Sequence, residues 1–335
     1  MACFNPLHGF PLLDTWTVNG KQAYRIIGLL DPLYDRKECI QIPCGKCIGC
    51  RLSYARQWAD RCMLELQYHD SAYFVTLTYN DEHVPRSAYG DPETGEAQPV
   101  LTLNRRDVQL FLKRLRRACP DDNIRYFGCA EYGPNTFRPH YHLIIFGLHL
   151  NDLQLKRQDV DGKVNAWTSV TLQAAWSERP FGNYSPILES LGDVECSDVT
   201  WEACNYVARY IVKKQLGPDG RNFYDSFNIT PPFTFMSLKP GIGRRYYDDH
   251  PEIYKYDTIS ISTPRGGRSI KPPRYYDKLF DIDHPDELAF IKSIRRLMAE
   301  NAQKFKLSRT SLSVFDLQEV EERAALRKVP NDFDI

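Results

Sequence analysis

The chain has 335 residues, of which 42% are hydrophobic and 26% charged, and its formal net charge is zero. This composition excludes collagen-like, fibrous and wholly disordered proteins, and it predicts one large domain with additions or two domains. No apolar run approaches the roughly 18 residues that a membrane helix needs, and the N-terminus lacks the features of a signal peptide. We therefore expect a cytoplasmic protein with no membrane partner.

Charge and cysteine are unevenly distributed along this neutral chain. Residues 101–127 hold seven basic and three acidic side chains, and residues 236–278 hold nine and five. Either stretch could follow a phosphate backbone, although a solvated protein face explains each of them equally well. The chain has ten cysteines, and clustered cysteines in a cytoplasmic protein more often bind metal than form disulfides.

The N-terminal half predicts two helices and one strong strand. Residues 1–52 read as irregular and Cys-rich, and residues 53–68 have apolar side chains at helical spacing. Residues 73–79 are rich in β-branched and aromatic types, which predicts a strand. Residues 80–99 carry turn signals and read as a loop. Asn104 is a suitable N-cap for a helix to Ala118, with an apolar stripe and a basic face.

The C-terminal half continues with two strands and four helices. The strands are predicted over residues 125–131 and from His140 onward, with a turn between them. The helices are predicted over residues 171–177, 200–215, 286–307 and 317–328. Gly217-Pro218-Asp219-Gly220 is expected to end the second of these helices, and residues 221–280 show no clear period.

This mixture of elements predicts an α+β fold, with a central antiparallel sheet and flanking helices, because no long parallel-sheet runs occur. The sequence divides into four segments on composition. They are a Cys-rich N-terminal segment (1–52), a core (53–220), a basic extension rich in Pro and Tyr (221–280) and a C-terminal helical segment (281–335).

Two histidines form the most informative pattern in the chain. His140 and His142 lie two residues apart at the start of an apolar strand, so both side chains point to one face. Glu131, near the loop end of the preceding strand, could add a carboxylate. This ligand set suits a divalent ion such as Mg²⁺ or Mn²⁺ with positions left open for substrate. The alternative is a strand with two hydrogen-bonded histidines of no catalytic role.

Two tyrosines share one face of the predicted helix over residues 200–215. Tyr206 and Tyr210 are four residues apart, and Lys213 and Lys214 continue their face one turn later. A tyrosine can attack a phosphodiester and become covalently attached, if a lysine or a metal compensates for its free pKa of about 10. Two packed aromatic residues are the alternative explanation.

A cysteine run predicts a second metal site. Three cysteines have a C-x-x-C-x-x-C spacing that lets their sulfurs meet at one ion: Cys44, Cys47 and Cys50. Structural zinc needs a fourth ligand, for which Cys3 is the first choice and Cys39 and Cys62 are the rivals. An iron–sulfur cluster and free thiols remain alternatives.

Together these motifs resemble the HUH endonucleases. Arg138-Pro139-His140-Tyr141-His142 resembles their metal motif, Tyr206 to Lys213 their two-tyrosine nucleophile motif, and Phe74 to Tyr79 their first core strand. Cys44 to Cys50, followed by residues 51–58, more closely resembles the replication initiation proteins of gokushoviruses, single-stranded DNA phages of the microvirus family. Residues 110–116, 239–243 and 273–278 fit this resemblance, which covers most of residues 1–280 but not the C-terminal helices.

The resemblance implies an initiator of rolling-circle replication in the cytoplasm of the bacterial host. Such an enzyme nicks the phage plus strand at its origin, keeps the 5′ phosphate on a tyrosine and releases a 3′ hydroxyl that primes synthesis. A second tyrosine then cleaves the regenerated origin, and the ends are joined. The implied partners are single-stranded origin DNA, double-stranded replicative-form DNA, a host helicase and a host polymerase.

The match assigns catalysis to Tyr206, Tyr210 and Lys213, and we expect DNA contacts from Arg138, Arg209 and Lys214. In the family a lysine tends to follow each tyrosine by three residues; Tyr210 has Lys213, but Tyr206 has Arg209. Arginine keeps the charge and not the geometry, which favours Tyr210 as the nucleophile.

Two rival functions remain open. One is a relaxase-like mobilisation protein with the same chemistry, and the other is a non-catalytic zinc protein that binds single-stranded DNA. The enzyme interpretation requires a gap between the histidine and tyrosine motifs that a nucleotide phosphate could occupy.

Overall fold

The computed structural model describes residues 3–17, 20, 22–28, 30–34, 36, 38–162, 164–179, 188–213, 217–263 and 266–327. Over these ranges, none of the helices combines the length and the apolar character that a membrane span requires. The chain divides into two compact units. The small unit joins Met1–Tyr54 to Ala289–Asn331, and the sheet unit is built from Ala55–Leu288.

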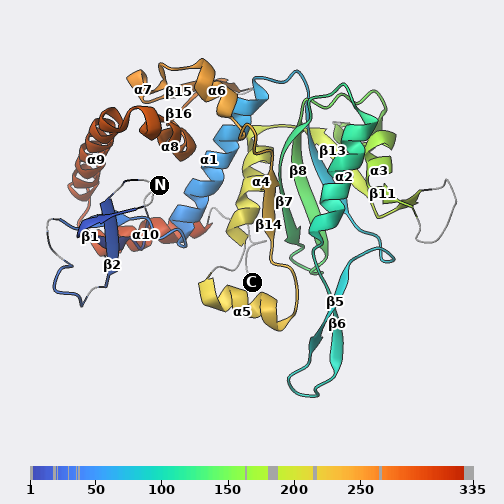
Figure 1. The fold of residues 1–335 in the computed structure, drawn as a ribbon, viewed down its shortest axis with the longest axis horizontal. Coiled ribbons are helices and arrows are strands. Elements are labelled where there is room, and N and C mark those ends of the chain that lie inside the picture. The colour runs from blue at the N-terminus through green and yellow to red at the C-terminus, as the bar shows by residue number, and fades with distance from the viewer. Residues whose placement is uncertain are drawn as a thin grey trace. The chain divides into compact units, whose positions relative to one another are not determined.

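A seven-stranded sheet forms the centre of the sheet unit (Figure 1). All of its paired strands are antiparallel, which confirms the predicted α+β fold with an antiparallel sheet. In spatial order the strands are β14 (Phe233–Met236), β7 (Arg125–Tyr132), β8 (Pro139–Phe146), β4 (Ala72–Thr78), β13 (Val194–Asp198), β10 (Val164–Ser169) and β9 (Leu153–Gln158). The strands predicted over residues 73–79, 125–131 and from His140 are therefore β4, β7 and β8.

Helices cover both faces of this sheet (Figure 1). One face carries α2 (Arg105–Ala118) and α3 (Val170–Ala175), and the other carries α1 (Ile48–Leu66) and α4 (Trp201–Lys213). The alternation of β8 assigns its side chains to these faces: Tyr141 belongs to the core cluster that includes Phe111 of α2, so His140 and His142 point to the α4 side. The metal motif is thus on the same face as the tyrosine helix.

Helix α2 forms as its sequence predicts. The side chain of Asn104 accepts a hydrogen bond from the backbone N–H of Arg106 at 2.9 Å, which satisfies a donor at the first turn. The apolar stripe packs on the sheet and consists of Val108, Phe111, Leu112 and Leu115, all buried. The basic residues of the helix are left on its outer surface.

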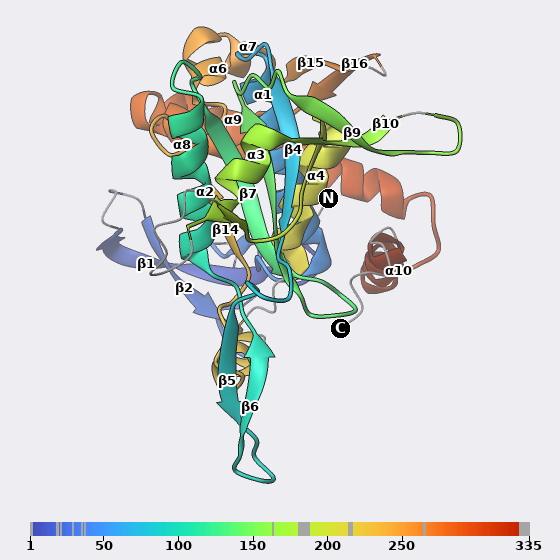
Figure 2. The same cartoon turned by 90° about the vertical axis from the view of Figure 1, so that its right-hand side faces the viewer.

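A β-hairpin replaces the loop predicted over residues 80–99. Its strands β5 (Arg86–Gly90) and β6 (Ala97–Leu101) pair with each other and extend away from the sheet in both views (Figures 1 and 2). The prediction failed because the residues of β5 alternate only between exposed and partly buried, and β6 shows no fully buried residue either. A strand without a buried face lacks the alternation that identifies strands in a sequence.

The small unit contains a three-stranded sheet where irregular structure was predicted. Its strands are β1 (Leu7–Trp16), β2 (Gln22–Ile27) and β3 (Ile40–Ile42), in the order β2-β1-β3. Most of β1 is exposed and it contains Pro11, so its sequence carries neither a buried face nor a clean strand composition. The two C-terminal helices are confirmed as α9 (Pro285–Leu307) and α10 (Val314–Arg327).

Short elements occupy the rest of the sheet unit. Gly217 and Pro218 begin a helix, because proline is well tolerated in a first helical turn. The segment without a clear period contains several more elements. These and the remaining short strands are α5 (Gly217–Ser226), α6 (Arg244–Asp249), α7 (Ile253–Tyr256), α8 (Arg274–Asp283), β11 (Ser177–Glu178), β12 (Glu189–Ser190), β15 (Ile259–Thr263) and β16 (Gly266–Ile270).

Candidate metal centres

Strands β7 and β8 bring the three predicted ligands together. Glu131 lies directly opposite His140 in the antiparallel register, and His142 follows on the same face. Oε1 of Glu131 is 2.7 Å from Nε2 of His140 and 3.4 Å from Nε2 of His142. The ligand atoms of all three residues lie within 4.8 Å of one another. This spacing fits one divalent cation bound between them.

The other nitrogen of each imidazole is held by the surrounding structure. Nδ1 of His140 is 3.0 Å from the carbonyl oxygen of Arg138, and Nδ1 of His142 is 3.0 Å from Oγ1 of Thr76. A carbonyl only accepts, so Nδ1 of His140 carries the proton and its Nε2 is the nitrogen left for a metal. Such contacts orient the rings and raise the basicity of metal-binding histidines.

The carboxylate of Glu131 is deeply buried, with the residue 2% exposed. Burial alone would raise the pKa of Glu131, but hydrogen bonds from His140 and His142 and the charges on their rings hold it below its ordinary value. A charged carboxylate beside two imidazoles is a donor set that Mg²⁺ or Mn²⁺ accepts, with positions remaining for phosphate oxygens.

Thr76 is a supporting residue that the sequence reasoning did not identify. We expect Thr76→Val to weaken Mn²⁺ binding about tenfold, measured by titration calorimetry, because the partner of Nδ1 of His142 is lost. Thr78→Val is the matched control: it lies on the same strand, and its hydroxyl donates to the carbonyl oxygen of Asp193. Equal affinities of the two variants would contradict this role.

The tyrosine helix packs next to the histidines. The ring of Tyr206 meets the ring of His142 edge-on, with centroids 5.4 Å apart, and that of Phe74 at 6.1 Å. Its side chain is nevertheless 45% exposed, whereas Cys204 and Val207 of α4 are buried, as predicted. The two motifs therefore adjoin directly, and the gap expected between them is absent at these rings. A phosphate would have to approach from the exposed side of Tyr206.

The other predicted site residues have different surroundings. Tyr210 and Lys213 lie in α4, but their side chains, and all of Lys214, fall outside the described residues. Arg209 is partly buried on the same helix. The guanidinium of Arg138 donates to the carbonyl oxygen of Tyr79 at 2.8 Å and to Asp81 at 2.7 Å, so it fastens the end of β4 to the start of β8. A DNA contact by Arg138 would have to share these donors.

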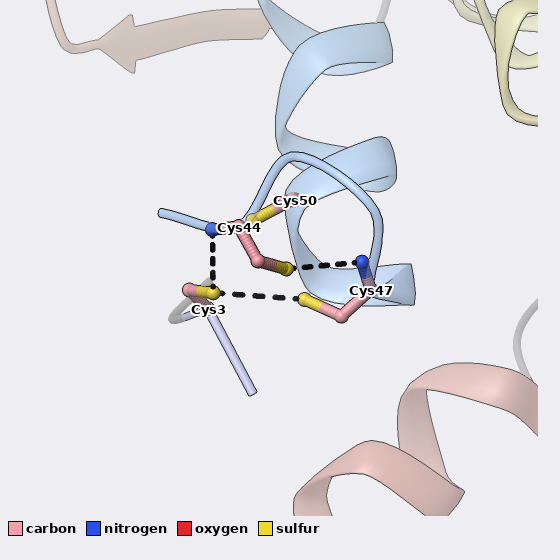
Figure 3. A group of neighbouring side chains, drawn as sticks. All are labelled: Cys3, Cys44, Cys47 and Cys50. Carbon is pink, nitrogen blue, oxygen red and sulfur yellow. Dashed lines mark hydrogen bonds between the residues drawn. The ribbon is translucent and has the colours of Figure 1, made fainter. Parts of the chain in front are cut away.

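Four cysteines converge in the small unit (Figure 3). The sulfurs of Cys3, Cys44, Cys47 and Cys50 lie within 4.8 Å of one another, which is the set predicted with Cys3 as the fourth member. Backbone N–H groups donate to these sulfurs: Cys44 to Cys3 at 3.2 Å, Cys47 to Cys44 at 3.3 Å, and Phe4 to Cys47 at 3.3 Å. Donors of this kind stabilise thiolates and so favour metal binding.

The cysteine cluster also organises the small unit around it. Burial disfavours the Cys44 thiolate, but N–H groups of Cys47 and Lys46 outweigh it and lower the pKa of Cys44 to about 7. Phe4 and Cys47 share a buried cluster with Ala325 of α10, and the side chain of Gln318 donates to the carbonyl oxygen of Phe4. The rivals are placed elsewhere: the Cys39 sulfur lies 2.9 Å from the carbonyl oxygen of Leu33, and Cys62 is fully buried in the sheet unit.

Comparison with known proteins agrees with this arrangement. A family model described as replication-associated protein ORF2 matches residues 72–215, which contain the histidine and tyrosine motifs. The replication-associated protein ORF2 of Spiroplasma virus 4 is 33% identical over 308 residues, covering 90% of this chain and 87% of the relative. The replication-associated protein VP4 of Bdellovibrio phage phiMH2K is 31% identical over 256 residues, covering 73% and 69%.

A third relative is more distant. The replication-associated protein ORF4 of Chlamydia phage 1 is 26% identical over 179 residues, covering 52% of this chain and 38% of that protein. No solved structure matches the chain at the level of significance that these relatives reach.

Proposed function

Because this chain belongs to the replication-associated protein family of small single-stranded DNA phages, we propose that it initiates phage replication by nicking and rejoining DNA. The observation that carries the proposal is one arrangement on one face of the sheet. Glu131, His140 and His142 form a cation site, and the exposed phenol of Tyr206 lies against it. A nucleophile next to a divalent-ion site is the combination that phosphodiester transfer requires.

The reaction follows from these residues. The phenolic oxygen of a tyrosine attacks the phosphorus in line, the bond from phosphorus to the 3′ oxygen breaks, and a 5′-phosphotyrosine forms. The bound Mg²⁺ or Mn²⁺ would neutralise charge on the phosphate oxygens. The phenol proton passes to a base or to water, and the released 3′ oxygen takes up a proton. The reverse reaction with another 3′ hydroxyl joins the ends.

The two tyrosines would alternate in the two cleavages of a replication round. The contact with His142 supports Tyr206 as the nucleophile already in place, whereas the lysine spacing favoured Tyr210. Lys213 would assist loss of the phenol proton, and Arg138, Arg209 and Lys214 would contact DNA phosphates. The core is proposed to be of the HUH type because its two histidines lie on a central strand beside the tyrosine helix.

The Cys3, Cys44, Cys47 and Cys50 cluster is proposed to hold a structural Zn²⁺, since four thiolates close a tetrahedral site and leave no position for substrate. The protein would act in the cytoplasm of the bacterial host on single-stranded origin DNA and double-stranded replicative-form DNA. A host helicase and a host polymerase would continue synthesis from the 3′ hydroxyl.

Metal dependence tests this proposal. With Mn²⁺ or Mg²⁺, the full chain should form a covalent adduct on 3′-labelled single-stranded oligonucleotides that tile the replicon encoding it. His140→Ala with His142→Ala should lower the adduct yield by roughly 10²-fold or more, because both imidazole ligands are lost. His149→Ala is the control, since His149 lies on the surface and bonds to Asp122. Adducts are measured on denaturing gels.

Two results would reject the enzyme. One is full adduct formation by the double His variant, which would place the metal site elsewhere. The other is tight, salt-sensitive binding of the oligonucleotides without any adduct, which would favour a non-catalytic protein that binds single-stranded DNA.

A further inference from the structure

A groove with aromatic walls lies on the opposite face of the sheet from the metal site. It runs between α2 and β14, an edge strand of the sheet over the described residues (Figure 2). Tyr126 lines the groove and Glu131 belongs to the metal site. They are five residues apart on β7, an odd number, so their side chains point to opposite faces. No role in the proposed cleavage falls to this groove.

Three aromatic rings form a row along the groove. Phe233 and Phe235 of β14 have ring centroids 6.0 Å apart, and Phe235 and Tyr126 are 6.1 Å apart. Phe233 is buried, whereas Phe235 and Tyr126 are partly exposed. Gly128 allows this row, because a Cβ there would lie 2.6 Å from the ring of Phe235. The two exposed rings offer flat apolar surfaces to a ligand.

Arginines stand at both ends of the row. The guanidinium of Arg105 lies 3.8 Å from the ring centroid of Phe233, and that of Arg116 lies 5.3 Å from that of Tyr126. Both arginines belong to α2 and are exposed. Each therefore pairs an aromatic surface with a positive charge at the edge of the groove.

The charge of α2 decides the kind of ligand. Its sequence contains six basic residues and one acidic residue, Asp107, which accepts a hydrogen bond from Tyr79 at 2.7 Å. In the part of the chain that the structure describes, the exposed cations of α2 form no ion pair with an acidic side chain. These cations are Arg105, Arg106, Lys113, Arg116 and Arg117. An uncompensated row of cations favours a polyanion.

We propose that this groove is a second DNA site that binds single-stranded DNA, with bases on Tyr126 and Phe235 and phosphates beside Arg105 and Arg116. Unpaired bases expose the flat faces that aromatic side chains stack on, while those of a duplex are occupied by neighbouring bases. If the proposed nicking is correct, the groove would retain one part of the origin strand while the metal face cuts another. The binding itself does not depend on the cleavage chemistry.

A charge pair on α2 tests the location of binding. Gln109 lines the groove and Lys113 lies one turn further on the outer face, so Gln109→Glu and Lys113→Gln each lower the net charge of the helix by one unit. Affinity of the full chain for an oligothymidine of about 16 nucleotides is measured by fluorescence anisotropy in excess EDTA, which prevents cleavage. Gln109→Glu should weaken binding about fivefold, and Lys113→Gln less than about twofold.

A ring pair tests stacking. Tyr126→Leu keeps apolar volume but removes the ring, and should weaken binding about fivefold or more, whereas Tyr126→Phe keeps the ring and should bind like the wild type. Equal melting temperatures of the two variants establish that folding is retained. The proposal is overturned if Tyr126→Leu and Gln109→Glu both bind as the wild type does.

Photocrosslinking separates this site from the metal face. Oligonucleotides containing 5-iodouracil are irradiated with the full chain, and the crosslinked peptides are mapped by mass spectrometry. Crosslinks in β7 at Tyr126 or in β14 support the groove. Crosslinks confined to α4 would overturn it and leave the proposed nicking untouched, whereas loss of adduct formation with intact groove crosslinks would count against the nicking alone.

Discussion

Full-length protein in which Phe replaces both Tyr206 and Tyr210 should form at most about one thousandth of the wild-type covalent adduct. Phenylalanine keeps the ring that packs against His142 and Phe74 but lacks the oxygen that must attack phosphorus. The loss should therefore come from chemistry and not from folding. Adduct yield with a 3′-labelled oligonucleotide and Mn²⁺ measures it, because the label stays with the 5′-phosphotyrosine fragment.

The single variants decide which tyrosine attacks first. Tyr206→Phe should lose most first-strand cleavage, since the Tyr206 ring is the one that lies 5.4 Å from the His142 ring. Tyr210→Phe should keep that cleavage and lose the joining step. The opposite result would support the lysine spacing that favours Tyr210. Tyr73→Phe, a partly buried residue on β4 next to Phe74, is the control for loss of a hydroxyl elsewhere.

The second large effect concerns the cysteine cluster. Cys47→Ser should remove one equivalent of zinc and lower the free energy of unfolding of the small unit by several kcal/mol, because structural zinc contributes about 10–16 kcal/mol in zinc-finger peptides. Cys47 is also part of the buried cluster with Phe4 and Ala325, so the N-terminus and α10 should loosen together. Metal analysis and urea unfolding of the full chain measure the two changes.

Cys39→Ser is the matched control for this experiment. Cys39 lies in the same unit and was a rival fourth ligand, but its sulfur faces the carbonyl oxygen of Leu33. This variant should keep its zinc and lose little stability. Retention of a full equivalent of zinc by Cys47→Ser would disprove the site, and iron with visible absorbance would replace zinc by an iron–sulfur cluster.

The features read correctly from the sequence are those that local periodicity encodes. The two-residue spacing of His140 and His142 places both on one face of any strand, whatever that strand packs against. The stripe of α2 with its Asn104 cap identifies a helix in the same way. The short spacing from Cys44 to Cys50 brings three sulfurs together without help from distant segments.

The errors share an opposite cause. The β5–β6 hairpin and the sheet of β1, β2 and β3 were read as loop or irregular structure because few of their residues are buried. Their pairing comes from backbone hydrogen bonds between strands, which leave little trace in the order of apolar side chains.

By itself, then, the sequence determined which residues could carry chemistry, since side-chain type and short spacing are local properties. The tertiary structure decided which of them meet. Strand register sets Glu131 opposite His140 and Thr76 beside His142, and helix packing brings Tyr206 to the same place. Chain folding selects Cys3 from three candidate cysteines. These choices depend on contacts between segments far apart in the chain, which spacing along one segment cannot encode.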